Sequence, residues 1–233
     1  MANRIHPTAV VGPGVELGRG NVVGPYAVLL GPCSIGDDNW IGPHVVLGTP
    51  PEVRRHDHGA AWDGDLVGAG VAIGSGTTLR EYTTVHSGSA TTTRVGSDCY
   101  VMNKVYVGHD GYIGDGVVIA SSVTMGGHVS VGDNANLGLG AMVHQRRVIG
   151  PGVMLGMGSV VTRDVPPFAK SFGNPARVQG VNSVGMTRTG LDVADAEDLG
   201  RLYASGIDLS VDWPAPAALQ PALDWWWART SAT

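Results

Sequence analysis

Several residues that can carry chemistry recur in this sequence at a single spacing. His109 and Asp110 are followed eighteen residues later by Gly127 and His128, and a further histidine stands at His144. A neutral imidazole can take a proton from an attacking hydroxyl or amine, because its pKa is near ambient pH. A carboxylate beside it can fix its tautomer, and the N–H of a glycine can stabilise an oxyanion. These groups are the parts of an acyl-transfer site, provided that the fold brings them together.

The elements that must position these residues are indicated by a repeat. An aliphatic residue recurs every six positions, and a glycine usually follows it. This period fits neither an α-helix nor an isolated amphipathic strand, but it fits a short strand followed by a corner. The sequence therefore predicts an all-β solenoid, a parallel β-helix whose triangular coils of eighteen residues stack about 4.8 Å apart. The anchor residues are Ile5, Val11, Leu17, Val23, Leu29, Ile35, Ile41 and Leu47, then Val67, Ile73, Leu79 and Val85, and then Val95, Val101, Val107, Ile113, Ile119, Met125, Val131, Leu137, Val143, Ile149, Leu155 and Val161.

Stacking converts sequence separation into geometry. The repeat runs without a break from Val95 to Val161, so His109 is expected directly beneath Gly127, and Asp110 beneath His128. The residues that then gather on one edge of the solenoid are His109, Asp110, Gly127, His128 and His144. The simpler alternative is a set of surface histidines at a corner.

Two interruptions of the repeat predict loops that leave the solenoid, at about residues 49–66 and 87–94. The first contains Trp62 and several charged residues, and the second is rich in Ser, Thr and Gly. Long insertions in a strict repeat are more often functional than decorative. We expect the β-helix to occupy residues 1–185 and a short helical extension residues 186–233, with one helix over 192–205 and another that holds Trp225, Trp226 and Trp227.

Charge and hydropathy exclude several classes of protein. The chain has 15 Lys and Arg against 20 Asp and Glu, and no basic stripe marks a nucleic-acid interface. No apolar run is long enough to span a membrane, and the N-terminal segment lacks the apolar core of a signal peptide. The expectation is a cytoplasmic protein without a nucleic-acid partner.

The motifs around this edge resemble a known family. They are Leu79–His86, Val95–Asp98, Val107–Asp110, Gly126–Val131, Val143–Gln145, Asp164–Pro167, Gly173–Asn174 and Gly180–Asn182. They are similar to those of the bacterial acyl-[acyl-carrier-protein]–UDP-N-acetylglucosamine O-acyltransferases of lipid A biosynthesis. The resemblance covers roughly residues 5–191. It implies a left-handed β-helix, an exception to the usual right-handed crossover, and a homotrimer with active sites in the clefts between subunits.

The resemblance also implies residue roles. The histidine at His109 is the general base, supported by Asp110, and the Gly127 N–H forms the oxyanion hole. The positions implied to contact the substrate are His86, His128, His144 and Gln145, and those implied to hold the nucleotide are Asn182 and Arg188.

Three departures from the family pattern bear on the substrates. Val184 and Thr189 replace a Glu and an Arg that the family uses for the nucleotide, so a UDP-sugar acceptor becomes less certain. Met157 stands where some members have a glycine that opens the acyl groove, so a short or medium acyl chain is expected. The segment after Leu191 is short and poor in Lys, whereas an acidic carrier protein needs a basic docking surface. A CoA donor is therefore an open alternative.

These observations predict an acyltransferase that moves an acyl group from a carrier-protein or CoA thioester to a hydroxyl or amine of a nucleotide sugar or related sugar, without a cofactor or metal. An alternative within acyl transfer is an N- or O-acyltransferase of an amino sugar or specialised metabolite without a UDP group. A γ-type carbonic anhydrase shares the fold, but the His-x4-His pair of its zinc site is missing from the sequence. A catalytically inactive scaffold is the remaining alternative.

Overall fold

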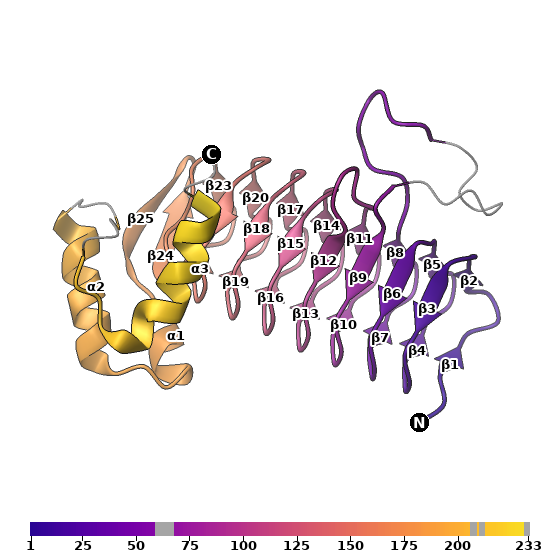
Figure 1. Cartoon of the computed structure of the whole chain (residues 1–233), viewed down its shortest axis with the longest axis horizontal. Helices are drawn as coiled ribbons and strands as arrows, with labels where there is room; N and C mark the ends of the chain where they lie inside the picture. The colour runs from indigo at the N-terminus through magenta and orange to yellow at the C-terminus, as the bar shows by residue number, and fades with distance from the viewer. Residues whose placement is uncertain (59–67, 206–208, 210–212, 231–233) are drawn as a thin grey trace.

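The computed structural model describes residues 1–58, 68–205, 209 and 213–230. In it the repeat forms a parallel β-helix whose coils stack in a row, with the N-terminal coil at one end and the helices at the other (Figure 1). The described strands form three sheets, which we call A, B and C, and successive strands of the chain visit them in turn. The predicted solenoid is confirmed.

Each sheet consists of short strands, and neighbouring strands in the order below are paired. Sheet A contains β1 (Arg4–Ile5), β4 (Val22–Val23), β7 (Trp40–Ile41), β10 (Thr78–Leu79), β13 (Tyr100–Val101), β16 (Val118–Ile119), β19 (Asn136–Leu137), β22 (Met154–Leu155), β24 (Ala169–Gly173) and β25 (Ala176–Val181). Sheet B contains β2 (Val10–Val11), β5 (Val28–Leu29), β8 (Val46–Leu47), β11 (Thr84–Val85), β14 (Tyr106–Val107), β17 (Thr124–Met125), β20 (Met142–Val143) and β23 (Val160–Val161). Sheet C contains β3 (Val15–Leu17), β6 (Cys33–Ile35), β9 (Val71–Ile73), β12 (Thr93–Val95), β15 (Tyr112–Ile113), β18 (Ser130–Val131) and β21 (Val148–Ile149).

The register between strands is constant wherever the repeat is unbroken. In sheet B, Val107 pairs with Met125, Met125 with Val143, and Val143 with Val161. Across the two insertions the anchors still pair with anchors, because Leu47 lies opposite Val85 and Val85 opposite Val107. The extra residues therefore leave the stack without causing a slip, and the predicted alignment of residues eighteen apart holds.

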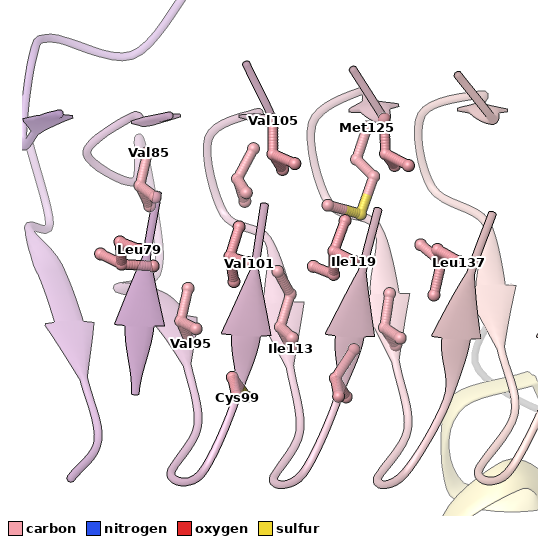
Figure 2. Packing of buried hydrophobic residues seen from close by; sticks show 14 of the residues in the cluster. Leu79, Val85, Val95, Cys99, Val101, Val105, Ile113, Ile119, Met125 and Leu137 are labelled. Atoms are coloured by element: carbon pink, nitrogen blue, oxygen red, sulfur yellow. The ribbon is translucent and has the colours of Figure 1, made fainter. Parts of the chain in front are cut away.

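The core is a column of anchors inside the prism. In Figure 2, Leu79, Val101, Ile119 and Leu137 project inward from successive coils, and each of them is at most 1 % exposed. The first coil departs from the expectation, because Ile5 is 43 % exposed. Strand β1 lies at the end of its sheet in the described part of the chain, and a solenoid buries its apolar face only against neighbouring coils.

The insertions differ slightly from their predicted limits. Thr93 and Arg94, placed in the second loop by the sequence, belong to strand β12, because they pair with Val71 and Ala72. In the first insertion the structure describes Thr49–His58 and resumes at Gly68, so Trp62 lies outside the described residues. The predicted anchor Val67 lies outside them as well.

The C-terminal segment closes the last coil. Strands β24 and β25 form an antiparallel hairpin, which the sequence did not predict. Helices follow, and they are α1 (Ser183–Arg188), α2 (Val193–Ser205), a 3-10 turn η2 (Ala217–Leu219) and α3 (Gln220–Thr230). Helix α1 crosses the predicted boundary at residue 185, because Asn182 caps its N-terminus by accepting from the Gly185 N–H. The predicted helix over 192–205 corresponds to α2.

The helical extension has its own apolar cluster, which packs against sheet C. It includes Met186, Leu199 and Trp226 together with Val148 of β21. The ring of Trp225 lies 6.2 Å from that of Tyr112 on β15, so this tryptophan packs on the solenoid. None of the helices in the described part of the chain combines the length and apolar character that a bilayer span requires.

Removing one core anchor should weaken the whole stack. Leu137 is fully buried between neighbouring coils, so Leu137→Ala should lower the free energy of unfolding by about 2–5 kcal/mol through lost burial and a residual cavity. Chemical denaturation measures this loss. The exposed Glu16→Ala on β3 serves as control, and an equal midpoint for the two variants would contradict the packing described above.

Candidate functional site

The candidate site lies on the corners that connect sheet B to sheet C, which we call the B–C ridge. His109 follows β14, Gly127 follows β17 and Gln145 follows β20, each at the same position of its corner. The next residues, Asp110 and His128, adopt left-handed backbone angles, with φ of 58° and 60°. Asp and His tolerate this conformation better than most residues. The His128 N–H donates to the His109 carbonyl at 2.9 Å, which fixes one corner on the next.

The imidazole of His109 lies directly against Gly127. A Cβ atom added at Gly127 would stand 2.6 Å from both Nε2 and Cε1 of the His109 ring, so any larger residue would force the ring to move. Among the described residues the Gly127 N–H has no hydrogen-bond acceptor. The predicted stacking of His109 beneath Gly127 is confirmed, and it sets an unhindered N–H donor beside an imidazole.

A short hydrogen bond joins His109 to Asp110. The distance from His109 Nδ1 to Asp110 Oδ2 is 2.6 Å, and the Asp110 side chain is completely buried. Because a carboxylate only accepts, Nδ1 must carry the proton. The other ring nitrogen, Nε2, is then a free base that faces Gly127.

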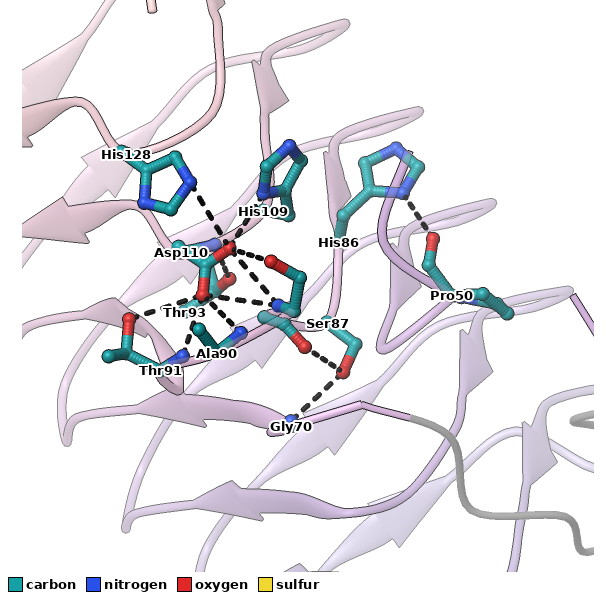
Figure 3. Close-up of polar contacts among 12 residues, drawn as sticks. Pro50, Gly70, His86, Ser87, Ala90, Thr91, Thr93, His109, Asp110 and His128 are labelled. Atoms are coloured by element: carbon teal, nitrogen blue, oxygen red, sulfur yellow. Dashed lines mark hydrogen bonds and ion pairs between the residues drawn. The ribbon is translucent and has the colours of Figure 1, made fainter. Parts of the chain in front are cut away.

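The second insertion encloses Asp110 (Figure 3). Oδ1 accepts from the N–H groups of Ala90 at 2.8 Å and Thr91 at 2.6 Å, and both oxygens accept from the Ser89 N–H at 3.1 Å. The Ser89 hydroxyl also donates to Oδ2 at 2.6 Å. Successive backbone N–H groups that converge in this way form an anion-binding nest. The insertion therefore acts as a cradle for the carboxylate.

The cradle determines the protonation state of Asp110. Burial alone would raise its pKa, but the hydrogen bonds from the Ser89 hydroxyl, the Thr91 N–H, His109 and the Ala90 N–H hold that pKa well below the ordinary value. Asp110 therefore stays ionised at any pH near neutrality. It can orient His109 and stabilise an imidazolium, but it does not compete for the proton.

His128 completes the group. Its ring meets that of His109 edge-on at 5.1 Å between centroids, and its Nε2 lies 3.7 Å from Asp110 Oδ2. Burial lowers the pKa of His128, Asp110 opposes this effect, and the charge of Arg146 lowers the pKa further. His128 is thus biased toward its neutral form, in which it can donate or accept a hydrogen bond.

The other predicted residues of this edge lie on adjacent coils. His86, which precedes His109 by one coil, bonds through Nδ1 to Thr49 Oγ1 at 3.1 Å and to the Pro50 carbonyl at 3.2 Å (Figure 3). Both partners are the first residues of the first insertion, directly after β8 on the preceding coil. His144 and Gln145 are exposed, one coil beyond Gly127.

Three predicted residues lie away from the ridge. Asn182 donates to the Gly152 carbonyl at 2.9 Å, at a corner between sheets C and A, and its side chain also caps α1. Arg188 ends that helix and is exposed. Met157, 75 % exposed, stands on a corner between sheets A and B. Within one chain none of them belongs to the His109 group, so they would meet it only across a subunit boundary.

Sequence reasoning missed the cradle residues Ser89, Ala90 and Thr91. A Ser/Thr/Gly-rich insertion one coil before a His–Asp pair is a signal that could have indicated them, because such segments readily expose backbone N–H groups. Thr93 was missed as well, and its Oγ1 accepts from the Asp110 N–H at 2.9 Å.

Some side chains of the site are of types that can bind a metal ion. Ligand atoms of His109, Asp110 and His128 lie within 4.8 Å of one another. The carboxylate oxygens, however, already accept the cradle hydrogen bonds, and His109 Nδ1 donates to one of them. This donor set fits proton transfer better than metal coordination.

Comparisons with known proteins point to acyltransferases. Residues 164–206 match the family model described as Udp N-acetylglucosamine O-acyltransferase; Domain 2. An acyl-[acyl-carrier-protein]–UDP-N-acetylglucosamine O-acyltransferase of Halorhodospira halophila is 44% identical over 62 residues, 27% of this chain and 24% of that protein. A dTDP-3-amino-3,6-dideoxy-alpha-D-galactopyranose 3-N-acetyltransferase of Aneurinibacillus thermoaerophilus is 46% identical over 43 residues, 18% of this chain and 22% of that protein. These matched segments span about a quarter of the relatives' length.

The structural match extends over nearly the whole chain. The UDP-N-acetylglucosamine acyltransferase of Bacteroides fragilis superposes with a TM-score of 0.76 at 26% identity, covering 96% of this chain and 94% of that one. The fold is the left-handed β-helix of these neighbours, as predicted. By its repeat, its superposition and the match of residues 164–206 to the family model, the chain is similar to the hexapeptide-repeat UDP-N-acetylglucosamine acyltransferases.

Proposed function

We propose that this protein transfers an acyl group from an acyl thioester to a nucleotide sugar, with His109 as the general base. The observation that carries the proposal is the juxtaposition of a free imidazole nitrogen with the unhindered Gly127 N–H. Asp110, held ionised by its cradle, supplies the fixed negative charge behind the ring. A base and an oxyanion donor at one point are what acyl transfer needs.

The reaction follows from these positions. Nε2 of His109 removes the proton as the acceptor oxygen or nitrogen attacks the thioester carbonyl, and the Gly127 N–H donates to the oxyanion of the tetrahedral intermediate. Collapse of that intermediate breaks the carbon–sulfur bond, and the departing thiolate takes the proton from His109. Asp110 stabilises the imidazolium that exists between the two transfers.

We propose the acceptor from the substrates that the names of the relatives give. The two sequence relatives act, by their names, on a UDP sugar and a dTDP sugar, one by O-transfer and one by N-transfer. A nucleotide sugar is their common feature, so an acceptor without a nucleotide is not favoured. Val184 and Thr189 carry no charge for the nucleotide, and both are exposed at α1. We propose that Asn182 and Arg188 provide the remaining contacts from an adjacent subunit.

A homotrimer would bring those residues to the ridge. Sheets A and B leave apolar side chains exposed on their outer faces, including Tyr100, Met142 and Met154 at 36–47 %. An uncovered apolar face of this kind favours association. A groove on sheet B, lined by Tyr106, Met142, His144 and Val160 among others, suits the acyl chain. Met157 precedes Val160 on the same coil and would limit the chain length.

Transfer itself is the first test. Acyl-CoA and acyl-carrier-protein donors, offered with UDP- and dTDP-sugars, should give an acylated sugar detectable by mass spectrometry. His109→Ala should lower kcat about 10²–10⁴-fold, because proton removal then falls to water. His6→Ala, an exposed histidine of the first coil, is the matched control. Unchanged turnover in a folded His109→Ala protein would refute the assignment.

The contact between Gly127 and His109 gives a second test. In Gly127→Ala the new methyl group would overlap the ring, so the imidazole must move and kcat should fall about 10²-fold. Steady-state kinetics and thermal unfolding separate this loss from misfolding. Gly200→Ala in α2, where an added Cβ meets nothing closer than 3.4 Å, is the control. Equal rates for both glycine variants would show that His109 does not act against Gly127.

The low pKa of Asp110 predicts a pH dependence of stability. A depressed pKa stabilises the fold at pH values above the ordinary Asp value of about 3.9, and this contribution is lost as the pH falls further. Asp110→Asn should therefore be less stable than wild type near neutrality, with the difference shrinking below about pH 4. Denaturant titrations across this range measure it, with the exposed Asp192→Asn as control. A difference that stays constant with pH would contradict the cradle.

A further inference from the structure

The B–C ridge continues beyond the candidate site, and its side chains there are positively charged. One coil past His128, the same position is Arg146, whose N–H donates to the Gly127 carbonyl at 2.9 Å. One coil past Gln145, the same position is Arg163, in the corner that follows β23. The ridge that begins with the enclosed His109–Asp110 pair thus continues to Arg146 and then to Arg163, which has Asp164 beside it.

The side chains of both arginines are exposed to solvent. Within the described part of the chain, neither guanidinium forms a hydrogen bond or an ion pair with a side chain. Their neighbour Arg147 behaves differently, because it pairs with Asp164 at 3.2 Å. The acidic groups of the ridge are therefore already satisfied, Asp110 by its cradle and Asp164 by Arg147. The outer end of the ridge keeps a net positive charge.

The distances between residues along the ridge can be compared with the length of the pantetheine arm of the acyl donor. Parallel coils are about 4.8 Å apart, so the backbones of Arg146 and Arg163 lie about 10 Å and about 14 Å from the coil of His109, and one coil less from that of Gly127; the extended arginine side chains add to this reach. The pantetheine arm of an acyl thioester has roughly the length of four peptide units between sulfur and phosphorus, about 14 Å when extended. A thioester carbonyl at the His109–Gly127 contact can therefore have its phosphate at these arginines.

We propose that Arg146 and Arg163 bind the phosphate of the 4′-phosphopantetheine arm of the acyl donor. This subsite rests on the proposed function, since it assumes a thioester at His109. Guanidinium groups suit it because their donors pair bidentately with phosphate oxygens and remain charged at any working pH. The arm follows the ridge, whereas the acyl chain leaves across sheet B toward Met157. The same phosphate occurs in CoA and in a carrier protein.

The test compares donors that differ only in the phosphate. Acyl-pantetheine, acyl-4′-phosphopantetheine, acyl-CoA and acyl-carrier protein carry the same acyl group, and each is titrated at saturating acceptor. Wild type should prefer the phosphorylated arm over acyl-pantetheine by about 10–100-fold in kcat/KM, the value of hydrogen bonds between charged groups. The double variant R146Q/R163Q should lose most of that preference, measured as the ratio of kcat/KM for acyl-4′-phosphopantetheine to kcat/KM for acyl-pantetheine in the same protein. A lower KM for acyl-CoA or for the carrier protein identifies the source.

A control variant and three contrary results test the proposed phosphate subsite. Arg19→Gln removes one exposed charge from the first coil and should keep the full preference. The subsite is overturned if wild type does not distinguish acyl-pantetheine from its phosphorylated form, or if R146Q/R163Q retains the preference. It is also overturned if the variant raises only the KM of the nucleotide sugar. Failure of the proposed function looks different, because wild type would then transfer no acyl group from any donor, acyl-pantetheine included.

Discussion

The structure depends on one constraint, the fixed register of parallel backbone hydrogen bonds between coils. Anchors such as Val107, Met125 and Val143 pair across sheet B at one constant offset, so a residue on one coil always has the same neighbour on the next. A slip of one residue would turn every anchor out of the core. The fold therefore holds corner side chains in straight columns, and any chemistry on a corner inherits that order.

Two additions convert one column into a reactive arrangement. The absence of a side chain at Gly127 lets the His109 ring occupy the space that a Cβ atom would fill, beside a residue whose N–H has no acceptor among the described residues. The second insertion then places three successive N–H groups around Asp110 from the preceding coil. Such donors are preorganised, because the solenoid fixes both ends of the loop. The cradle costs the fold little, since the anchors on either side keep their pairing.

Charge is distributed along the same ridge in an ordered way. The carboxylate of Asp110 is buried and fully hydrogen-bonded, so its field acts mainly on His109 and His128. Farther along, Arg146 and Arg163 face solvent. Because the coils are evenly spaced, the imidazole of His109 and the two guanidinium groups lie at regular intervals along one edge. The outer faces of sheets A and B, in contrast, expose apolar side chains such as Tyr100, Met142 and Met154.

The sequence alone determined the solenoid, its register and the contact between His109 and Gly127, because a six-residue period of anchors is local and coils of equal length can stack in only one way. It did not reveal the cradle. Ser89, Ala90 and Thr91 act through backbone N–H groups, whose directions depend on the path of the loop and not on side-chain type. The exposure of Ile5, the capping by Asn182 and the pairing of Arg147 with Asp164 were likewise decided by the tertiary structure. Each depends on which neighbours surround a residue, and a repeat pattern carries no information about where the stack ends or what folds over it.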